Sequence, residues 1–220
     1  MKKSLRFLFL TVCLIAACQV QAYPKGKEEP FLERTIEQFS LRDTDLLDVL
    51  GKLSFYYRVP IGIELSADES RSPKINLDVR KTKVKDILNM IVLQDDRYRW
   101  ETAESVVNFI PVKQRDPLLG KVLNVPVQSF RPSRGISKIA LRDAITELPE
   151  IQEILKVSGV SSYNIGFTSV DRVKVPENIN LAMYNTTVRA ILNKVVKDTD
   201  FKFWVIGRDG NNRNLLYVTL

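Results

Sequence analysis

The stretch KINLDVRKTKVKDILNMIVLQDDRYRW, residues 74–100, returns in the second half of the chain as NINLAMYNTTVRAILNKVVKDTDFKFW, residues 178–204. The two stretches align without a gap at an offset of 104 residues, and 11 of their 27 positions are identical. Average residue usage gives roughly one or two identities by chance. Amphipathic spacing alone does not explain the matched polar and aromatic positions. These are Asn76 and Asn180, Thr82 and Thr186, Asn89 and Asn193, Asp96 and Asp200, and Trp100 and Trp204. We therefore interpret the chain as an internal duplication.

The apolar periodicity of the first copy predicts the order β-α-β-β-α-β-β. Short strands are expected at residues 35–41, 61–65 and 75–79, and a hairpin at residues 98–101 and 106–110. A first helix, capped by Thr44, turns Leu46, Leu47, Leu50 and Leu53 to one side. A second helix, capped by Thr82, turns Val84, Ile87, Leu88, Ile91 and Val92 inward. We expect the repeated tryptophans to anchor the cores by their large buried area.

The second copy follows the same order with one addition. We expect strands at residues 122–130, 165–167 and 179–183, and a hairpin at residues 201–206 and 215–220. One helix carries Ile139, Leu141, Ala144, Ile145 and Leu148, and another carries Val188, Ile191, Leu192, Val195 and Val196. Residues 149–157 space their apolar side chains as a helix, so they predict a helical insertion.

These patterns predict an α+β fold of two tandem modules with small mixed sheets. We place the first module at residues 34–113, a linker at 114–121 and the second module at 122–220. Asp116-Pro117 in the linker is interpreted as a break in helical structure, because the residue before proline is biased away from the helical conformation.

The N-terminus has the pattern of a secretory signal peptide. Lys2, Lys3 and Arg6 precede a largely apolar run of 12 residues, which is too short to cross a bilayer as a helix. Removal of these three basic residues lowers the net charge from +7 to +4. An exported protein with so mild a basic excess lacks the signature of a nucleic-acid-binding protein.

Two cleavage sites are compatible with this pattern. Removal of residues 1–22 gives a soluble periplasmic protein. The sequence Ile15-Ala16-Ala17-Cys18 also resembles a lipobox, in which residues 1–17 are removed and Cys18 is lipidated. The protein would then be anchored to the outer membrane by its lipid. In both cases we interpret residues 23–33 as a tether.

The composition excludes several kinds of chemistry. The chain has no histidine, and Cys13 and Cys18 both lie in the N-terminal segment. Serine and cysteine nucleophiles activated by histidine, and structural zinc sites, are therefore excluded from the two modules. No glycine-rich phosphate loop is present. We expect no enzymatic activity, cofactor or metal. A hydrolase that uses only carboxylates is a less favoured alternative.

The copies resemble the short N-terminal domain of secretins and TonB-dependent receptors. The resemblance depends on the leucine-rich first helix at residues 46–53, Ile61-Gly62-Ile63, the strand at residues 75–79 and the helix at residues 84–92. It covers residues 35–112 and, more loosely, residues 122–220. The resemblance implies a protein-interaction role, and we do not expect the channel or receptor function of those proteins to carry over to these modules. It supplies no catalytic residues.

These observations predict an exported adaptor that binds an envelope complex of the secretin, pilus or transporter type. A small-molecule ligand and a nucleic-acid partner are not expected. The candidate interaction residues are Tyr56, Tyr57 and Arg58 in an aromatic run and Arg131 and Arg134 in a basic loop. A module that binds peptidoglycan or another glycan is the alternative, because the chain is mildly basic and carries available aromatic side chains.

Overall fold

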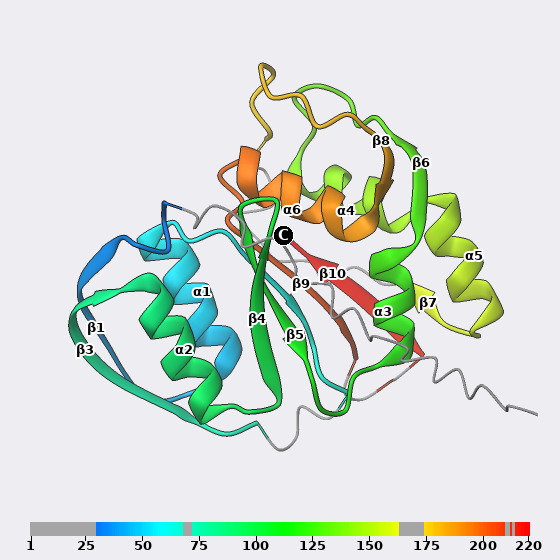
Figure 1. Cartoon of the computed structure of the whole chain (residues 1–220). Coiled ribbons are helices and arrows are strands. Elements are labelled where there is room, and N and C mark those ends of the chain that lie inside the picture. Colours follow the sequence, from blue (N-terminus) through cyan, green and yellow to red (C-terminus); the bar gives the residue numbers. More distant parts are fainter. Residues whose placement is uncertain (1–29, 68–71, 163–173, 210–211, 213) are drawn as a thin grey trace, which may run out of the picture.

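The computed structural model describes residues 30–67, 72–162, 174–209, 212 and 214–220. It confirms a mixed α+β fold (Figure 1). The first half of the chain forms β1 (Thr35–Thr44), α1 (Leu46–Tyr57), β2 (Ile61–Glu64), β3 (Ile75–Lys83), α2 (Val84–Gln94), β4 (Tyr98–Ala103) and β5 (Val106–Pro111). The second half forms α3 (Pro117–Asn124), β6 (Pro126–Phe130), α4 (Lys138–Thr146), α5 (Pro149–Val157), β7 (Ser161–Ser162), β8 (Met183–Thr187), α6 (Val188–Asp198), β9 (Phe203–Arg208) and β10 (Leu215–Thr219).

Strands from both halves form one six-stranded sheet in the order β4-β5-β2-β9-β10-β7. Its central joint is the parallel pairing of β2 with β9, which places Gly62 opposite Trp204. The other strands form two antiparallel ribbons, β1 with β3 and β6 with β8. The two halves therefore share backbone hydrogen bonds and do not fold around separate sheets.

The two faces of this sheet belong to two different cores. Along β9, Val205 packs into the core of the first half, whereas Trp204 and Ile206 pack into the core of the second half. On β5, Val107 and Val106 divide between the cores in the same way. Because neighbouring side chains of a strand point to opposite faces, the helices of the two halves lie on opposite sides of the sheet. Figure 1 shows α1 and α2 on one side, with α3, α4 and α6 on the other.

Helices and hairpins form where the apolar spacing predicts them. The predicted inward residues of α1 and α2 are buried, except that Leu47 and Val92 are only partly covered. The insertion at residues 149–157 is the helix α5, with Ile151 and Leu155 buried. The hairpins β4–β5 and β9–β10 are likewise present.

The two predicted threonine caps are wrong, because each threonine belongs to the preceding strand. The Thr44 hydroxyl donates to the Arg42 carbonyl, and the Thr82 hydroxyl donates to the Arg80 carbonyl, both at 2.9 Å. The first two helices begin after Asp45 and Lys83 without a side-chain cap. In the second half Thr187 does cap α6, accepting from the Ala190 N–H.

Residues 117–124 also differ from the prediction, which assigned residues 114–121 to a linker and began a strand at residue 122. They form α3, and only residues 126–130 form the strand β6. The Asp116 carboxylate accepts from the Leu118 N–H at 2.8 Å, and Pro117 occupies the first helical turn. Asp-Pro is thus a helix start here, since proline lacks the N–H that a helix leaves unpaired at that position.

The predicted strand at residues 179–183 is displaced toward its C-terminal end. The strand is β8, which begins at Met183; residues 177–178 form a turn and residues 179–182 have no regular structure. The Asn180 side chain accepts from the Ala182 N–H at 2.9 Å, and the Ile179 N–H donates to the Pro176 carbonyl. These local bonds compete with strand pairing. The predicted strand at residues 165–167 lies outside the described residues.

Both repeated tryptophans make the same side-chain hydrogen bond. Trp100 donates from Nε1 to Asn89 Oδ1 at 3.0 Å, and Trp204 donates to Asn193 Oδ1 at 2.9 Å. Each bond joins a strand to the helix before it, at positions that the repeat alignment matches. Trp204 is fully buried, whereas Trp100 is partly exposed.

A buried carboxylate ties the linker and α6 to β2. Glu64 is fully buried on β2 and accepts hydrogen bonds from two arginines. Arg115 Nε lies 2.8 Å from Glu64 Oε1, and Arg189 Nη2 lies 3.0 Å from Oε2. A buried charge is tolerated only when it is paired and hydrogen-bonded, so these contacts fix the second half against the first.

Candidate functional site

The structure separates the three candidates of the aromatic run. Tyr57 is a structural residue: its hydroxyl donates to the Gln38 carbonyl at 2.6 Å, and its ring meets Phe39 edge-to-face at 5.6 Å. Tyr56, in contrast, is 69% exposed. Arg58 ends α1 in the left-handed conformation at φ 53°, and its side chain extends into solvent.

Tyr56 has an exposed neighbour that the sequence reasoning did not select. Phe55 is 74% exposed, and its ring meets the Tyr56 ring edge-to-face with centroids 5.1 Å apart. The helical spacing contains the signal, because the buried positions Leu46, Leu50 and Leu53 leave residues 55 and 56 off the inward face. An exposed pair of large aromatic side chains on a helix is unusual for a monomer surface.

The aromatic pair borders a groove between α1 and β9, which we call the α1–β9 groove. It has a volume of about 440 Å³. Its lining is formed by one side of α1 and by the two β9 residues that face the first core. The lining residues are Leu47, Asp48, Gly51, Lys52, Phe55, Tyr56, Phe203 and Val205. An apolar floor beneath an aromatic rim is a surface on which a protein partner can bury side chains.

The end of the α1–β9 groove is held rigidly. Ser54 Oγ on α1 donates to the Lys202 carbonyl at 2.7 Å, which ties the last turn of α1 to the start of β9. Lys202 extends its ammonium group to carbonyls at the end of α6, including that of Thr199. Burial lowers the pKa of Lys202, Asp200 opposes this shift, and Arg58 adds to it. Both walls of the groove are therefore fixed before any partner arrives.

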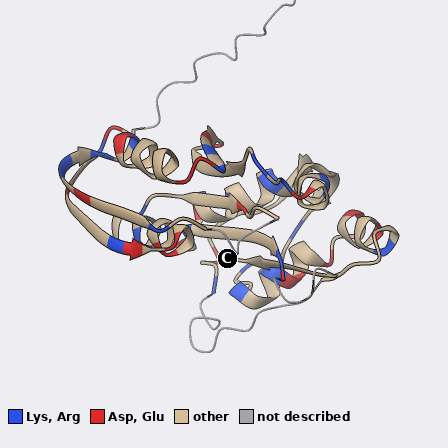
Figure 2. Ribbon diagram, turned by 90° about the horizontal axis from the view of Figure 1, so that it is seen from below, with Lys and Arg blue, Asp and Glu red and all other residues tan. Residues whose placement is uncertain are grey.

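The charged residues around this end do not form a strong site by themselves. Arg58 Nη1 lies 3.8 Å from Asp200 Oδ1, and both side chains are more than half exposed. Such surface pairs contribute little free energy. Figure 2 shows charges of both signs spread over the helices and strand ends, while the central strands are mainly uncharged.

The two basic-loop candidates lie elsewhere. Arg131 follows β6 and places its guanidinium 4.6 Å from the centre of the Tyr184 ring on β8. Tyr184 is 52% exposed, and Arg134 is also exposed. This is a cation–π contact at the end of the β6–β8 ribbon. The β6–β8 ribbon is separate from the six-stranded sheet that contains β9, so this contact is not part of the α1–β9 groove.

The buried carboxylates among the described residues are held by arginines. Glu64 is paired with Arg115 and Arg189, and Asp95 accepts from Arg97 at 2.7 Å. Across the described ranges, no group of three or more Asp, Glu, His or Cys side chains could hold a metal ion. Two larger hollows, of about 630 and 530 Å³, open beside α5 and beside the β6–β8 ribbon.

Two findings concern the rest of the chain. Within the described residues, no helix combines the length and apolar character needed to span a membrane. Cys18, the lipidation candidate, lies outside those residues.

The comparisons with known proteins identify no relative. No protein-family model, no curated protein and no solved structure matches the chain.

Proposed function

We propose that this chain is an exported, non-enzymatic adaptor that binds a protein partner in the bacterial cell envelope through the α1–β9 groove. The observation that carries the proposal is the exposed Phe55–Tyr56 pair beside an apolar floor. Aromatic side chains at the centre of an interface contribute much of the binding energy in protein complexes.

The rigidity of the groove supports this proposal. Phe55 and Tyr56 project from the last turn of α1, and that turn is fixed to β9 through Ser54. Binding groups held by a folded scaffold lose little conformational entropy when a partner binds. The lack of histidine, and of cysteine after residue 18, agrees with a binding role and leaves few side chains for nucleophilic catalysis.

The N-terminal pattern and the family resemblance suggest the setting. The signal-peptide pattern of residues 1–22 supports a periplasmic location, with lipidation at Cys18 as the other cleavage outcome. The resemblance to the short domain of secretins and TonB-dependent receptors favours an envelope complex of secretin, pilus or transporter type as the partner.

Site-specific photocrosslinking in intact cells of the native host tests the proposal. A photoreactive residue replaces Lys52, which lines the groove beside the aromatic pair. We expect one discrete adduct with an envelope protein, and we expect the double variant Phe55→Ser/Tyr56→Ser to abolish it. Because both side chains are largely exposed, this variant should fold normally.

Leu93→Ser is the matched control, because Leu93 on α2 is 81% exposed and lies outside the groove lining. It should leave the adduct unchanged. Crosslinking that yields only the monomer, or an adduct that survives the double variant, would refute the proposal. Sedimentation of the purified protein with cell-wall sacculi, lost in the same double variant, would instead support the glycan-binding alternative.

A further inference from the structure

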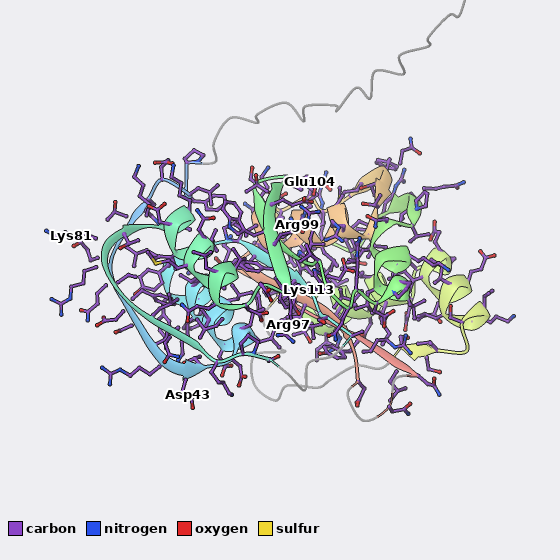
Figure 3. The ribbon with its side chains drawn as sticks, turned by 60° about the horizontal axis from the view of Figure 1, so that its bottom comes forward. Asp43, Lys81, Arg97, Arg99, Glu104 and Lys113 are labelled. Carbon is purple, nitrogen blue, oxygen red and sulfur yellow. The ribbon has the colours of Figure 1, made fainter. Side chains whose placement is uncertain are left out.

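The strand β4 leaves one side of its backbone without a neighbouring strand in the described structure. It lies at one end of the six-stranded sheet and pairs only with β5. Figure 3 shows Arg99 on this strand, with Arg97 and Glu104 near its two ends. The opposite end of the sheet is β7, which has only two residues. β4 has six residues, so it is the longer free edge of this sheet.

The repeat alignment shows how such an edge is used elsewhere in the chain. At the offset of 104, β4 corresponds to residues 202–207, most of which form β9. Like β4, β9 pairs on one side with the strand that follows it in a hairpin, which is β10. On its other side, β9 pairs in parallel with β2. The β2 residue opposite Trp204 is Gly62, where a Cβ would stand 2.0 Å from the indole Cε2. A small residue is therefore required beside this tryptophan.

Trp100 is the matching tryptophan without that neighbour. It makes the same hydrogen bond to the preceding helix, from Nε1 to Asn89, and packs against the first core. It nevertheless remains partly exposed, whereas Trp204 is fully buried. The strand that would complete its burial is absent from the described chain.

The other face of β4 defines the chemistry of the missing strand. Ile61 and Ile63 of β2 pair with Phe203 and Val205 of β9. The β4 residues that match Phe203 and Val205 are Arg99 and Glu101, which form an ion pair at 2.5 Å. Charges on an edge strand disfavour apolar strands, including β2-like strands of another copy. A partner strand must therefore present polar groups of complementary charge on both sides of its small residue.

We infer that the outer edge of β4 binds an extended segment of a partner protein with an acidic–small–basic pattern. The segment adds in parallel, as β2 does on β9, with the small residue against Trp100. Its acidic residue lies beside Arg99 and its basic residue beside Glu101. This contact would be a second site of the proposed adaptor, on a different strand from those that line the α1–β9 groove.

Peptide binding to the full chain, observed by NMR, tests this inference. The probe copies residues 59–66 with Glu and Lys in place of the two isoleucines, giving VPEGKELS. We expect the Trp100 indole N–H resonance, assigned with Trp100→Phe, to shift on titration while that of Trp204 does not. A peptide with valine at the glycine position should bind at least about tenfold more weakly, because the clash resembles overpacking of a core.

Charge reversal provides the matched control. The peptide VPKGEELS should bind about threefold more weakly or worse, and the double variant Arg99→Glu/Glu101→Arg should reverse that preference. No Trp100 shift, equal binding of all peptides, or a shift confined to Trp204 would each overturn the inference. These readouts are independent of the crosslink at Lys52, so loss of the groove partner would not be mistaken for failure at β4.

Discussion

Replacement of Gly62 by alanine should destabilise the whole fold, although it adds a single methyl group. The new Cβ would lie 2.0 Å from Cε2 of Trp204 and 2.3 Å from Cζ2. Carbon atoms in contact are about 3.5–4.0 Å apart, so the overlap exceeds an ångström. Trp204 is fully buried and cannot turn into solvent.

The magnitude follows from what Trp204 would lose if it moved. Overpacking of a core costs about 1–3 kcal/mol. Movement of the indole also breaks its 2.9 Å bond to Asn193, a residue that is itself fully buried. An unsatisfied buried group costs about 1–3 kcal/mol more. We expect a total loss of about 3–5 kcal/mol, which is a large part of the stability of a typical domain.

Urea unfolding followed by circular dichroism measures this loss, and Gly51→Ala is the control. Gly51 lies within α1, and a Cβ there meets no atom within 4 Å. Because alanine favours a helix over glycine by about 0.5–1 kcal/mol, this substitution should raise the unfolding midpoint. The same chemical change should thus have opposite signs at the two sites.

A double-mutant cycle identifies the cause. In a Trp204→Leu background, Gly62→Ala should cost less than about 1 kcal/mol, because the smaller side chain leaves room for the methyl group. A loss of under 1 kcal/mol for Gly62→Ala in the wild-type background would refute the close approach. An equal loss in both backgrounds would refute the role of Trp204.

Two further predictions concern charged groups. Glu64→Gln should destabilise the protein by about 3 kcal/mol in urea unfolding, because it leaves Arg189 largely buried without its counter-charge. The control Asp45→Asn, at an exposed ion pair, should cost under about 1 kcal/mol. Similar losses in the two variants would contradict the reasoning. Hydrogen bonds from Lys83 and then Lys85 lower the pKa of Glu33 to about 2. Its stabilising contribution should therefore be complete above the ordinary value of 4.5 and lost as pH falls through 2. Carbon-detected NMR titration should show this low midpoint and its rise in Lys83→Met, and a wild-type midpoint near 4.5 would contradict it.

Helices and hairpins could be predicted from the sequence because their determining interactions are local. The apolar spacing of α1 and α2 and the hairpin β4–β5 each depend on residues within about a dozen positions of one another. The helix α3, which the sequence analysis did not predict, has a local cause as well. Asp116-Pro117 is compatible with a chain break or with a helix start, and the apolar residues after it decide for the helix.

The shared sheet could not be predicted in the same way. β2 joins β9 across about 140 residues of sequence, and nothing local in Ile61-Gly62-Ile63 indicates which strand it will meet. Gly62 itself suggests close approach of another group, but only the structure shows that this group is Trp204. The sequence therefore indicated only one wall of the α1–β9 groove, the α1 side that carries Tyr56. The β9 residues that form the rest of the lining could not be predicted.

The strands β4 and β9, which the sequence alignment at an offset of 104 residues matches, differ at the positions beside their tryptophans. On the strand that receives a neighbour, Phe203 and Val205 are apolar and face the first core, and Val205 is buried. On the strand that does not, the matching positions are Arg99 and Glu101. Natural sheets protect free edges with charge to prevent indiscriminate pairing. The apolar residues of β9 thus suit the pairing with β2 of the same chain, whereas Arg99 and Glu101 disfavour an apolar strand beside β4. A strand that does pair with β4 must therefore bring complementary charges from another protein.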